Sequence, residues 1–235
     1  MSTYFVTGTD TDAGKTLATS ALLYAARAQG LGTLGLKPVA SGSDATPDGL
    51  RNRDALALQA QSAPSVSYAT VNPWAFAPAI APHLAASEAG DPLSLDALVN
   101  TLSTTLEQHP RALTLIEGAG GWRVPLNAHE DFCDIPRAMN LPVILVVGLK
   151  LGCLNHARLT AEAVVADGLP LAGWIGSVVD PAFAADPTRY AANLAVLEHR
   201  LPAPCLGTLP FLDTPSAATA HRYLSLAPLL TLEPQ

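Results

Sequence analysis

Short apolar runs alternate with longer amphipathic segments along nearly the whole chain. The runs contain few polar positions, which is typical of parallel strands that are covered on both faces. They predict strands at residues 3–7, 33–39, 112–117, 143–147, 171–178 and 205–209. The intervening segments have helical periodicity and predict helices that include residues 17–29, 54–61, 95–109, 155–167 and 188–200. This alternation predicts a doubly wound α/β fold with a mostly parallel sheet.

Turn and breaker residues delimit the predicted elements. Gly30 and Gly168 each follow the end of a predicted helix, where glycine is a common stop signal. The proline-rich segment 72–92 interrupts the alternation and predicts an excursion at the ends of the strands. No change of composition marks a linker, so we expect a single domain over residues 1–226 and a C-terminal tail over 227–235.

The composition favours a compact folded chain and argues against several classes of partner. Of the 235 residues, 49% are hydrophobic and 14% are charged. The net charge is −7 and Lys and Arg do not cluster, so we expect no nucleic-acid binding. Apolar stretches such as residues 142–148 are too short to span a membrane, and we expect no signal peptide, because residues 1–3 lead directly into the first predicted strand. Cys133, Cys153 and Cys205 are widely spaced and odd in number, which fits a reducing cytoplasm.

A glycine-containing loop, GTDTDAGKT, connects the first predicted strand to the first predicted helix. Backbone N–H groups of such a loop point at phosphate oxygens, and the helix N-terminus favours the bound anion. Lys15 supplies a cation for the outer phosphates, and the Thr16 hydroxyl suits magnesium. Five residues separate Gly8 from Gly14 instead of the usual four. The loop nevertheless predicts a P-loop nucleotide-binding fold much more strongly than a chance glycine turn.

Further charged residues follow other predicted strands, at the edge where open α/β sheets bind ligands. Glu117 ends a buried strand and is well placed to bind magnesium, directly or through water. Asp54 suits a magnesium ligand and a helix N-cap equally well. Lys37 favours stabilisation of a transferring phosphoryl group over a surface role, whereas for Lys150 the two interpretations are equal.

Five ordered motifs resemble the dethiobiotin synthetase family: GTDTDAGKT, LGLKPVASGS, RNRDALAL, LIEGAGGWRVPL and VILVVGLKLGCLNHA. The resemblance extends from Tyr4 to Leu226. It implies a homodimeric enzyme that uses ATP and Mg²⁺ to close 7,8-diaminononanoate and carbon dioxide into a cyclic urea. A substrate amine would capture carbon dioxide as a carbamate, which would then take the γ-phosphoryl group. The second amine would finally displace phosphate from this mixed anhydride.

The resemblance also assigns roles to residues within these motifs. Lys15 and Lys37 would neutralise the phosphoryl and carbamate oxygens, and Thr11 and Ser41 would position the carbamate. Asp12 would contact nucleotide and substrate, and it stands where many members of the family have Glu. Because the Asp side chain is shorter than that of Glu, we expect Asp12 to contact its ligands differently from the Glu of those members. The resemblance thus implies a site for two substrates built around the phosphate loop.

The implied nucleotide site draws on several motifs. The magnesium ligands would be Thr16, Asp54 and Glu117. The nucleotide contacts would be Asp12, Ala13, Gly14, Lys15, Thr16, Leu17, Asp54, Glu117, Gly118, Ala119, Gly120, Ser177, Pro210, Phe211 and Leu212. Many family members have Asn in place of Ser177, where it reads the adenine edge. Serine lacks a planar amide with paired donor and acceptor, so we expect weaker discrimination between ATP and CTP.

The far carboxylate of the substrate would bind at a second segment. Gly152, Cys153, Leu154 and Asn155 would present backbone N–H groups at a helix start. With Tyr190 they would come from the partner subunit, so the resemblance implies an active site at the dimer interface. Considered alone, Cys153 is better interpreted as a small packed residue than as a nucleophile.

Two other classes of protein share this kind of nucleotide fold. A partitioning or site-selection ATPase commonly has an additional lysine early in the phosphate loop and a membrane helix or basic DNA patch. Residues 8–14 contain no lysine, and residues 217–235 have no basic amphipathic face. A catalytically silent nucleotide-binding protein would have no need of Lys37, Asp54 and Glu117 together. We therefore expect an ATP-dependent cyclo-ligase.

Overall fold

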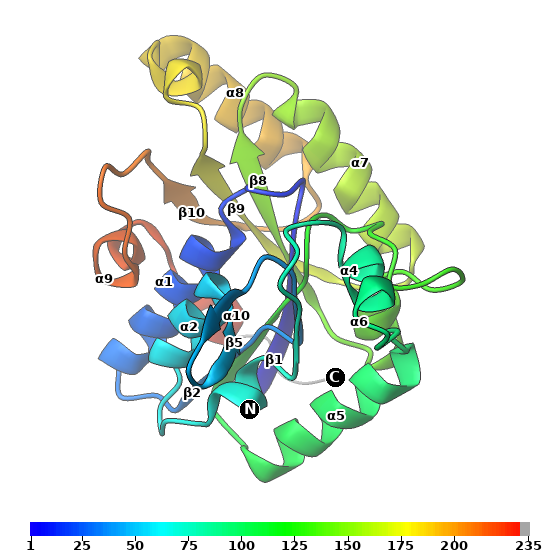
Figure 1. Ribbon diagram of the computed structural model, residues 1–235. Coiled ribbons are helices and arrows are strands. Elements are labelled where there is room, and N and C mark those ends of the chain that lie inside the picture. The colour runs from blue at the N-terminus through cyan, green and yellow to red at the C-terminus, as the bar shows by residue number, and fades with distance from the viewer. Residues whose placement is uncertain (231–235) are drawn as a thin grey trace.

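Six parallel strands form the central sheet of the protein (Figure 1). This computed structural model describes residues 1–230. The strand order is β10-β9-β8-β1-β7-β2, so the chain builds the sheet on both sides of β1. The strands are β1 (Ser2–Gly8), β2 (Thr33–Leu36), β7 (Leu113–Glu117), β8 (Val143–Leu149), β9 (Leu171–Val178) and β10 (Cys205–Leu209). The predicted doubly wound, mostly parallel α/β fold is confirmed.

Helices cover both faces of this sheet, as Figure 1 shows for α1 and α2 on one side and α5 and α7 on the other. The first face carries α1 (Lys15–Ala28), α2 (Arg53–Ala60), α9 (Ala217–Ala220) and α10 (Ala227–Leu230). The second carries α5 (Leu95–Gln108), α6 (Asp134–Ala138), α7 (Cys153–Ala166) and α8 (Pro187–Arg200). Along β8, Ile144 and Val146 pack into one core, whereas Leu145 and Val147 pack into the other. Burial on both faces explains why the strands are continuously apolar.

The predicted strand at residues 33–39 is wrong over its last three residues, because β2 ends at Leu36. The Lys37 N–H donates to Val71 O at 2.9 Å, and Pro38 has no N–H with which to continue the ladder. Val39 and Ala40 instead form β3, which pairs with β6 (Trp74–Ala75) in a separate small sheet. All other predicted strands and helices agree with the structure to within two residues at each end.

Short elements fill the long connections. They are β4 (Asp44–Thr46), β5 (Gly49–Arg51), α3 (Tyr68–Val71), α4 (Pro82–Glu88), η1 (Pro181–Ala184) and η2 (His221–Tyr223). The proline-rich segment 72–92 contains β6 and α4 and lies at the carboxyl edge of the sheet, as predicted.

The C-terminal segment packs onto the sheet. The predicted tail begins with α10, whose Leu229 is buried. The Tyr4 hydroxyl donates to Leu229 O at 2.6 Å, which ties this segment to β1. Residues 231–235 of the predicted tail lie outside the described residues, so the boundary at residue 226 stays a prediction.

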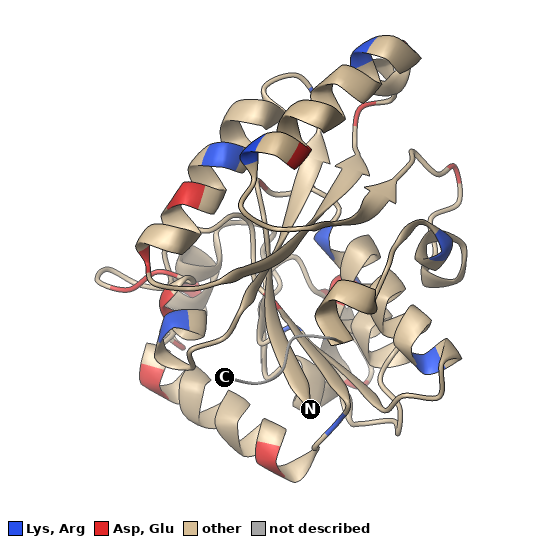
Figure 2. Ribbon diagram, turned by 180° about the vertical axis from the view of Figure 1, so that it is seen from behind, with Lys and Arg blue, Asp and Glu red and all other residues tan. Residues whose placement is uncertain are grey.

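Charged residues are few and scattered. Figure 2 shows them singly on the helices and connections, while the strands are almost free of them. Among residues 1–230, no helix combines the length and apolar character needed to cross a membrane.

Candidate active site

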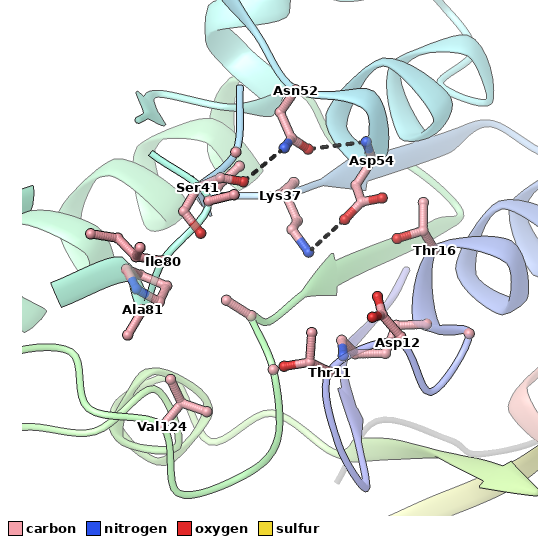
Figure 3. A pocket seen from close by; sticks show the side chains of 18 of the residues that line it. Thr11, Asp12, Thr16, Lys37, Ser41, Asn52, Asp54, Ile80, Ala81 and Val124 are labelled. Atoms are coloured by element: carbon pink, nitrogen blue, oxygen red, sulfur yellow. Dashed lines mark hydrogen bonds and ion pairs between the residues drawn. The ribbon is translucent and has the colours of Figure 1, made fainter. Parts of the chain in front are cut away.

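A pocket of about 880 Å³ lies at the carboxyl ends of β1, β2 and β7. These three strands are close neighbours in the sheet, so the segments that follow them converge on the same space. Figure 3 shows Thr11, Asp12 and Thr16 of the phosphate loop on one side and Ile80 and Ala81 on the other. The lining residues are Thr11, Asp12, Gly14, Lys15, Thr16, Leu17, Lys37, Ala40, Ser41, Gly42, Asn52, Asp54, Ala79, Ile80, Ala81, Pro82, Ala119, Gly120 and Val124.

The phosphate loop is fixed by its backbone. Gly14 has φ +88°, and a Cβ atom there would lie 2.9 Å from the Cβ of Ser177, so glycine is required on both counts. The Thr9 N–H donates to Val146 O at 3.0 Å, and the Thr9 hydroxyl accepts from the Gly148 N–H at 3.1 Å. These bonds attach the loop to β8. The loop therefore presents a preformed N-terminus of α1 to the pocket.

Lys15 begins α1 and reaches back across the loop. Its ammonium donates to Asp10 O at 3.0 Å, and the side chain is largely buried. Burial, together with the positive charge of Lys37, lowers the pKa of Lys15 to about 8. An anion between the two lysines would relieve both effects, because it would supply the missing counter-charge.

The Lys37 ammonium lies at the centre of a buried polar cluster. It contacts Glu117 Oε1 at 2.7 Å, Gly118 O at 3.1 Å and Asp54 Oδ2 at 3.4 Å. Burial alone would lower the pKa of Lys37, but the charges and hydrogen bonds of Glu117 and Asp54 outweigh burial and raise it. Lys37 is therefore a permanent cation inside the pocket, and the surface interpretation of this lysine is wrong.

Glu117 is fully buried at the end of β7. Its Oε1 accepts from the Lys37 ammonium and from the Thr16 hydroxyl, the latter at 2.8 Å. Its Oε2 has no hydrogen-bond partner among residues 1–230. An unpartnered carboxylate oxygen in a buried position is costly, so this atom is suited to a cation or an ordered water.

Asp54 faces the same cluster from α2. The N-cap of α2 is Asn52, whose side chain accepts from the N–H groups of Asp54 and Ala55 at 3.0 and 3.2 Å. The N-cap interpretation of Asp54 is therefore wrong, because Asn52 satisfies the orphan donors. The Asp54 carboxylate is instead free to pair with Lys37 (Figure 3).

Together these residues form a donor set of hard oxygen atoms. The Thr16 hydroxyl, the Asp54 carboxylate and the Glu117 carboxylate all contact either Lys37 or one another. Carboxylate and hydroxyl oxygens are the ligands that Mg²⁺ prefers. The unpartnered Glu117 Oε2 adds an observation of this structure that fits such an ion.

Lys150 lies outside the pocket lining, after β8. Its ammonium contacts Asp10 Oδ2 at 3.2 Å, and both side chains are exposed to solvent. This hydrogen bond is the main reason why the pKa of Asp10 is lowered. Lys150 thus pairs with the outer side of the phosphate loop and does not enter the cavity.

Several residues that the resemblance assigned to the site surround the pocket without lining it. Glu117 and Gly118 contact the lining residue Lys37, Ala13 precedes the lining residue Gly14, and Ser177 lies against Gly14 from β9. Within residues 1–230, the pocket lining also lacks Gly152, Cys153, Leu154, Asn155, Tyr190, Pro210, Phe211 and Leu212. Burial raises the pKa of the Cys153 thiol, which fits the interpretation as a packed residue.

Eight of the residues that line the pocket were not predicted from the sequence. The missed residues are Ala40, Gly42, Asn52, Ala79, Ile80, Ala81, Pro82 and Val124. Asn52 carried a usable signal, because Asn is among the strongest N-cap residues and here precedes an apolar helical run. The small apolar residues carried none, since no periodicity distinguishes them from other loop residues.

Pocket, loop and sheet define a nucleotide-binding enzyme of the P-loop class. A family model described as the AAA domain matches residues 2–219. The ATP-dependent dethiobiotin synthetase BioD of Chromohalobacter salexigens is 62% identical, with 96% of this chain and 98% of that protein covered. The protein of the same name from Pseudomonas aeruginosa is 55% identical, with 97% and 98% covered. The chain belongs to the dethiobiotin synthetase family.

Solved structures with low sequence identity share the fold. The MinC:MinD cell division protein complex of Aquifex aeolicus matches with a TM-score of 0.56 and 12% identity over 96% of this chain and 88% of that chain. The septum site-determining protein MinD of Pyrococcus horikoshii, complexed with Mg-ADP, gives 0.53 and 16% over 88% and 81%. These values establish a common fold and nothing about the reaction.

Proposed function

We propose that this protein closes 7,8-diaminononanoate and carbon dioxide into dethiobiotin while it converts ATP to ADP and phosphate. Family membership supports an ATP-dependent ligase. The observation that carries the proposal is the buried Lys37, which faces the phosphate loop across one pocket and remains charged. A loop that only binds nucleotide has no need of this second buried cation.

The chemistry follows from where charge accumulates. A substrate amine attacks carbon dioxide to give a carbamate, and the carbamate oxygen then attacks the γ-phosphorus and expels ADP. The second amine attacks the carbonyl carbon of the resulting anhydride, closes the ring and releases phosphate. Lys15 and Lys37 would neutralise the phosphoryl and carbamate oxygens, while Thr11 and Ser41 would orient the carbamate.

Magnesium would bind to Thr16, Asp54 and Glu117. The unpartnered Glu117 Oε2 and the convergence of three oxygen donors support this assignment. The ion would supply charge neutralisation at the phosphates, as it does in other P-loop enzymes. Because Lys37 already pairs with Glu117 and Asp54, these carboxylates would serve the ammonium and the ion together.

The remaining nucleotide contacts follow the family pattern. Asp12, Ala13, Gly14 and Leu17 would surround the phosphates, and Gly118, Ala119 and Gly120 would lie beside them. Ser177, Pro210, Phe211 and Leu212 would lie toward the base. Ser177 has a short side chain packed against Gly14, which supports weaker discrimination between ATP and CTP than an Asn would give.

The proposed assembly is a homodimer in the cytoplasm. The family resemblance assigns Gly152, Cys153, Leu154, Asn155 and Tyr190 to the site of the partner subunit. The neighbouring Leu151 is 92% exposed, as expected of a residue available to a second subunit. Three free cysteines and the use of ATP support a reducing compartment.

The direct test measures dethiobiotin by mass spectrometry in mixtures that contain ATP, Mg²⁺, bicarbonate and the diamine. We expect product and stoichiometric ADP only when all four are present. ATP hydrolysis that proceeds equally well without the diamine would contradict the proposal and favour a switch ATPase.

A further inference from the structure

Asn52, which lines the pocket, is joined through its backbone N–H to the Tyr68 hydroxyl, and Tyr68 is joined to the Asn72 side chain, so that the three residues form a continuous hydrogen-bonded chain. The Tyr68 hydroxyl accepts from the Asn52 N–H at 2.7 Å and donates to Asn72 Oδ1 at 2.8 Å. Asn52 and Asn72 are 7% and 3% exposed. Because buried amides satisfy their donors and acceptors only in particular geometries, this chain restricts the backbone segments that it joins.

One end of the chain holds the backbone of Lys37. The Asn72 amide donates to Lys37 O at 2.7 Å, and the Lys37 N–H donates to Val71 O at 2.9 Å. Since β2 ends at Leu36, Lys37 lies beyond the ladder of the central sheet. Its backbone position is therefore set by residues 71 and 72 and not by a neighbouring strand.

The other end holds Asp54 and Ser41. The Asn52 Oδ1 accepts from the Asp54 N–H, and the Asn52 amide donates to Ser41 O at 3.2 Å. One side chain thus joins the start of α2 to the segment that follows Lys37. Figure 3 shows Asn52 between Ser41 and Asp54, with Lys37 directed at the Asp54 carboxylate.

We propose that Asn52, Tyr68 and Asn72 are positioning residues that set the distance between the Lys37 ammonium and the Asp54 carboxylate. This inference rests on the proposed function of the site. Lys37 directly follows β2, whereas Asp54 lies on α2, and the Lys37 ammonium is 3.4 Å from the Asp54 carboxylate. A small change in this distance should lower the rate strongly, because the cation must lie close to the negative charge that develops in the transition state.

The test compares Tyr68→Phe with Tyr4→Phe. Each substitution removes one hydroxyl and keeps the ring, but the Tyr4 hydroxyl bonds to Leu229 O at the opposite end of β1. We expect similar small losses of Tm for both variants. For Tyr68→Phe we expect kcat to fall about tenfold while the KM for ATP changes little. Electron paramagnetic resonance can follow the binding of Mn²⁺, used in place of Mg²⁺. Mn²⁺ should bind the Tyr68→Phe enzyme–ADP complex more weakly than the wild-type complex.

Tyr4→Phe should retain the wild-type kcat and Mn²⁺ affinity. Asn72→Ala provides a second variant and should repeat the pattern of Tyr68→Phe. Unchanged kcat or unchanged Mn²⁺ affinity in Tyr68→Phe would overturn the inference, as would equal losses in Tyr4→Phe. If the wild-type enzyme makes no dethiobiotin, the proposed function fails, and the Mn²⁺ titration by itself still decides whether Asp54 is displaced.

Discussion

At the scale of single residues, the site depends on two buried lysines with opposite electrostatic surroundings. Lys37 is enclosed by the Glu117 and Asp54 carboxylates, whereas among residues 1–230 the only hydrogen-bond acceptor of the Lys15 ammonium is the backbone carbonyl of Asp10. The two carboxylates outweigh burial and raise the pKa of Lys37, whereas burial and the charge of Lys37 lower the pKa of Lys15 to about 8. The two lysines should therefore respond differently to substitution and to pH.

Replacement of Lys37 by Met should abolish dethiobiotin formation, with a loss of about a hundredfold or more. It should also lower the free energy of unfolding by about 3 kcal/mol in the absence of magnesium, because Glu117 stays buried without its cation. Product assays and urea unfolding measure the two effects. Lys150→Met is the control, since its exposed ion pair with Asp10 contributes less than about 1 kcal/mol. Wild-type turnover by Lys37→Met would contradict the assignment.

ATP binding at pH 8.5 should be accompanied by uptake of roughly half a proton or more, because phosphate restores the charge of Lys15. Calorimetry in buffers of different ionisation enthalpy measures this uptake. The folded pKa of Lys15 lies below its unfolded value. The charged form therefore opposes folding below pH 8, and this opposition fades as the pH rises toward 10.5. Proton release, or no exchange, would contradict the role of Lys15.

At the scale of elements, α1 shows how two glycines with similar backbones differ in function. Gly14 and Gly30 have φ of +88° and +79° at opposite ends of the helix. A Cβ at Gly14 would meet Ser177, whereas a Cβ at Gly30 would have no heavy atom within 4 Å. Only the first position joins the helix to the phosphate loop.

Gly30→Ala should cost about 1 kcal/mol of stability, since it places an L side chain at positive φ, and ATP affinity should be unchanged. Gly14→Ala should cost more and weaken ATP binding by about tenfold or more, because the loop must move its N–H groups to avoid Ser177. Thermal unfolding and nucleotide titration distinguish the two. Equal ATP affinities in both variants would contradict the need for this loop geometry.

The sequence could predict those parts of the site that depend on neighbouring residues. The strand, loop and helix around Lys15 follow each other directly, and Glu117 ends a continuously apolar run. The break after Leu36 had one signal in the sequence, Pro38, which has no N–H for the ladder, but the bond from Lys37 to Val71 is tertiary and could not be predicted. The wall at residues 79–82 was missed for the same reason: tertiary packing brings this irregular segment to the pocket.

At the scale of the whole molecule, the order of the strands assembles the site. β7 lies between β1 and β2, so the phosphate loop, Glu117 and Lys37 meet although they are distant in sequence. The sheet does not bring Asn155 or Tyr190 of the same chain to this pocket, within the residues described. The proposed dimer would complete the site from a second chain.

Mixing two inactive variants tests this assembly. Lys37→Met homodimers are mixed with Asn155→Asp homodimers, in which a carboxylate would repel the carboxylate of the substrate. After subunit exchange they should form heterodimers with one intact site. Random exchange should restore about a quarter of wild-type activity. Size-exclusion chromatography of each parent checks that it is dimeric. Activity that stays at the sum of the two parents would show that Asn155 acts within its own chain or not at all.

The central claim is that the pocket transfers the γ-phosphoryl group to a carbamate before the ring closes. Turnover with ¹⁸O-labelled carbon dioxide, in a mixture analysed before the label exchanges with water, tests it most directly. Attack by the carbamate oxygen places one labelled oxygen in each phosphate released, and mass spectrometry of the phosphate should find it. Phosphate without label, formed together with dethiobiotin, would contradict the account.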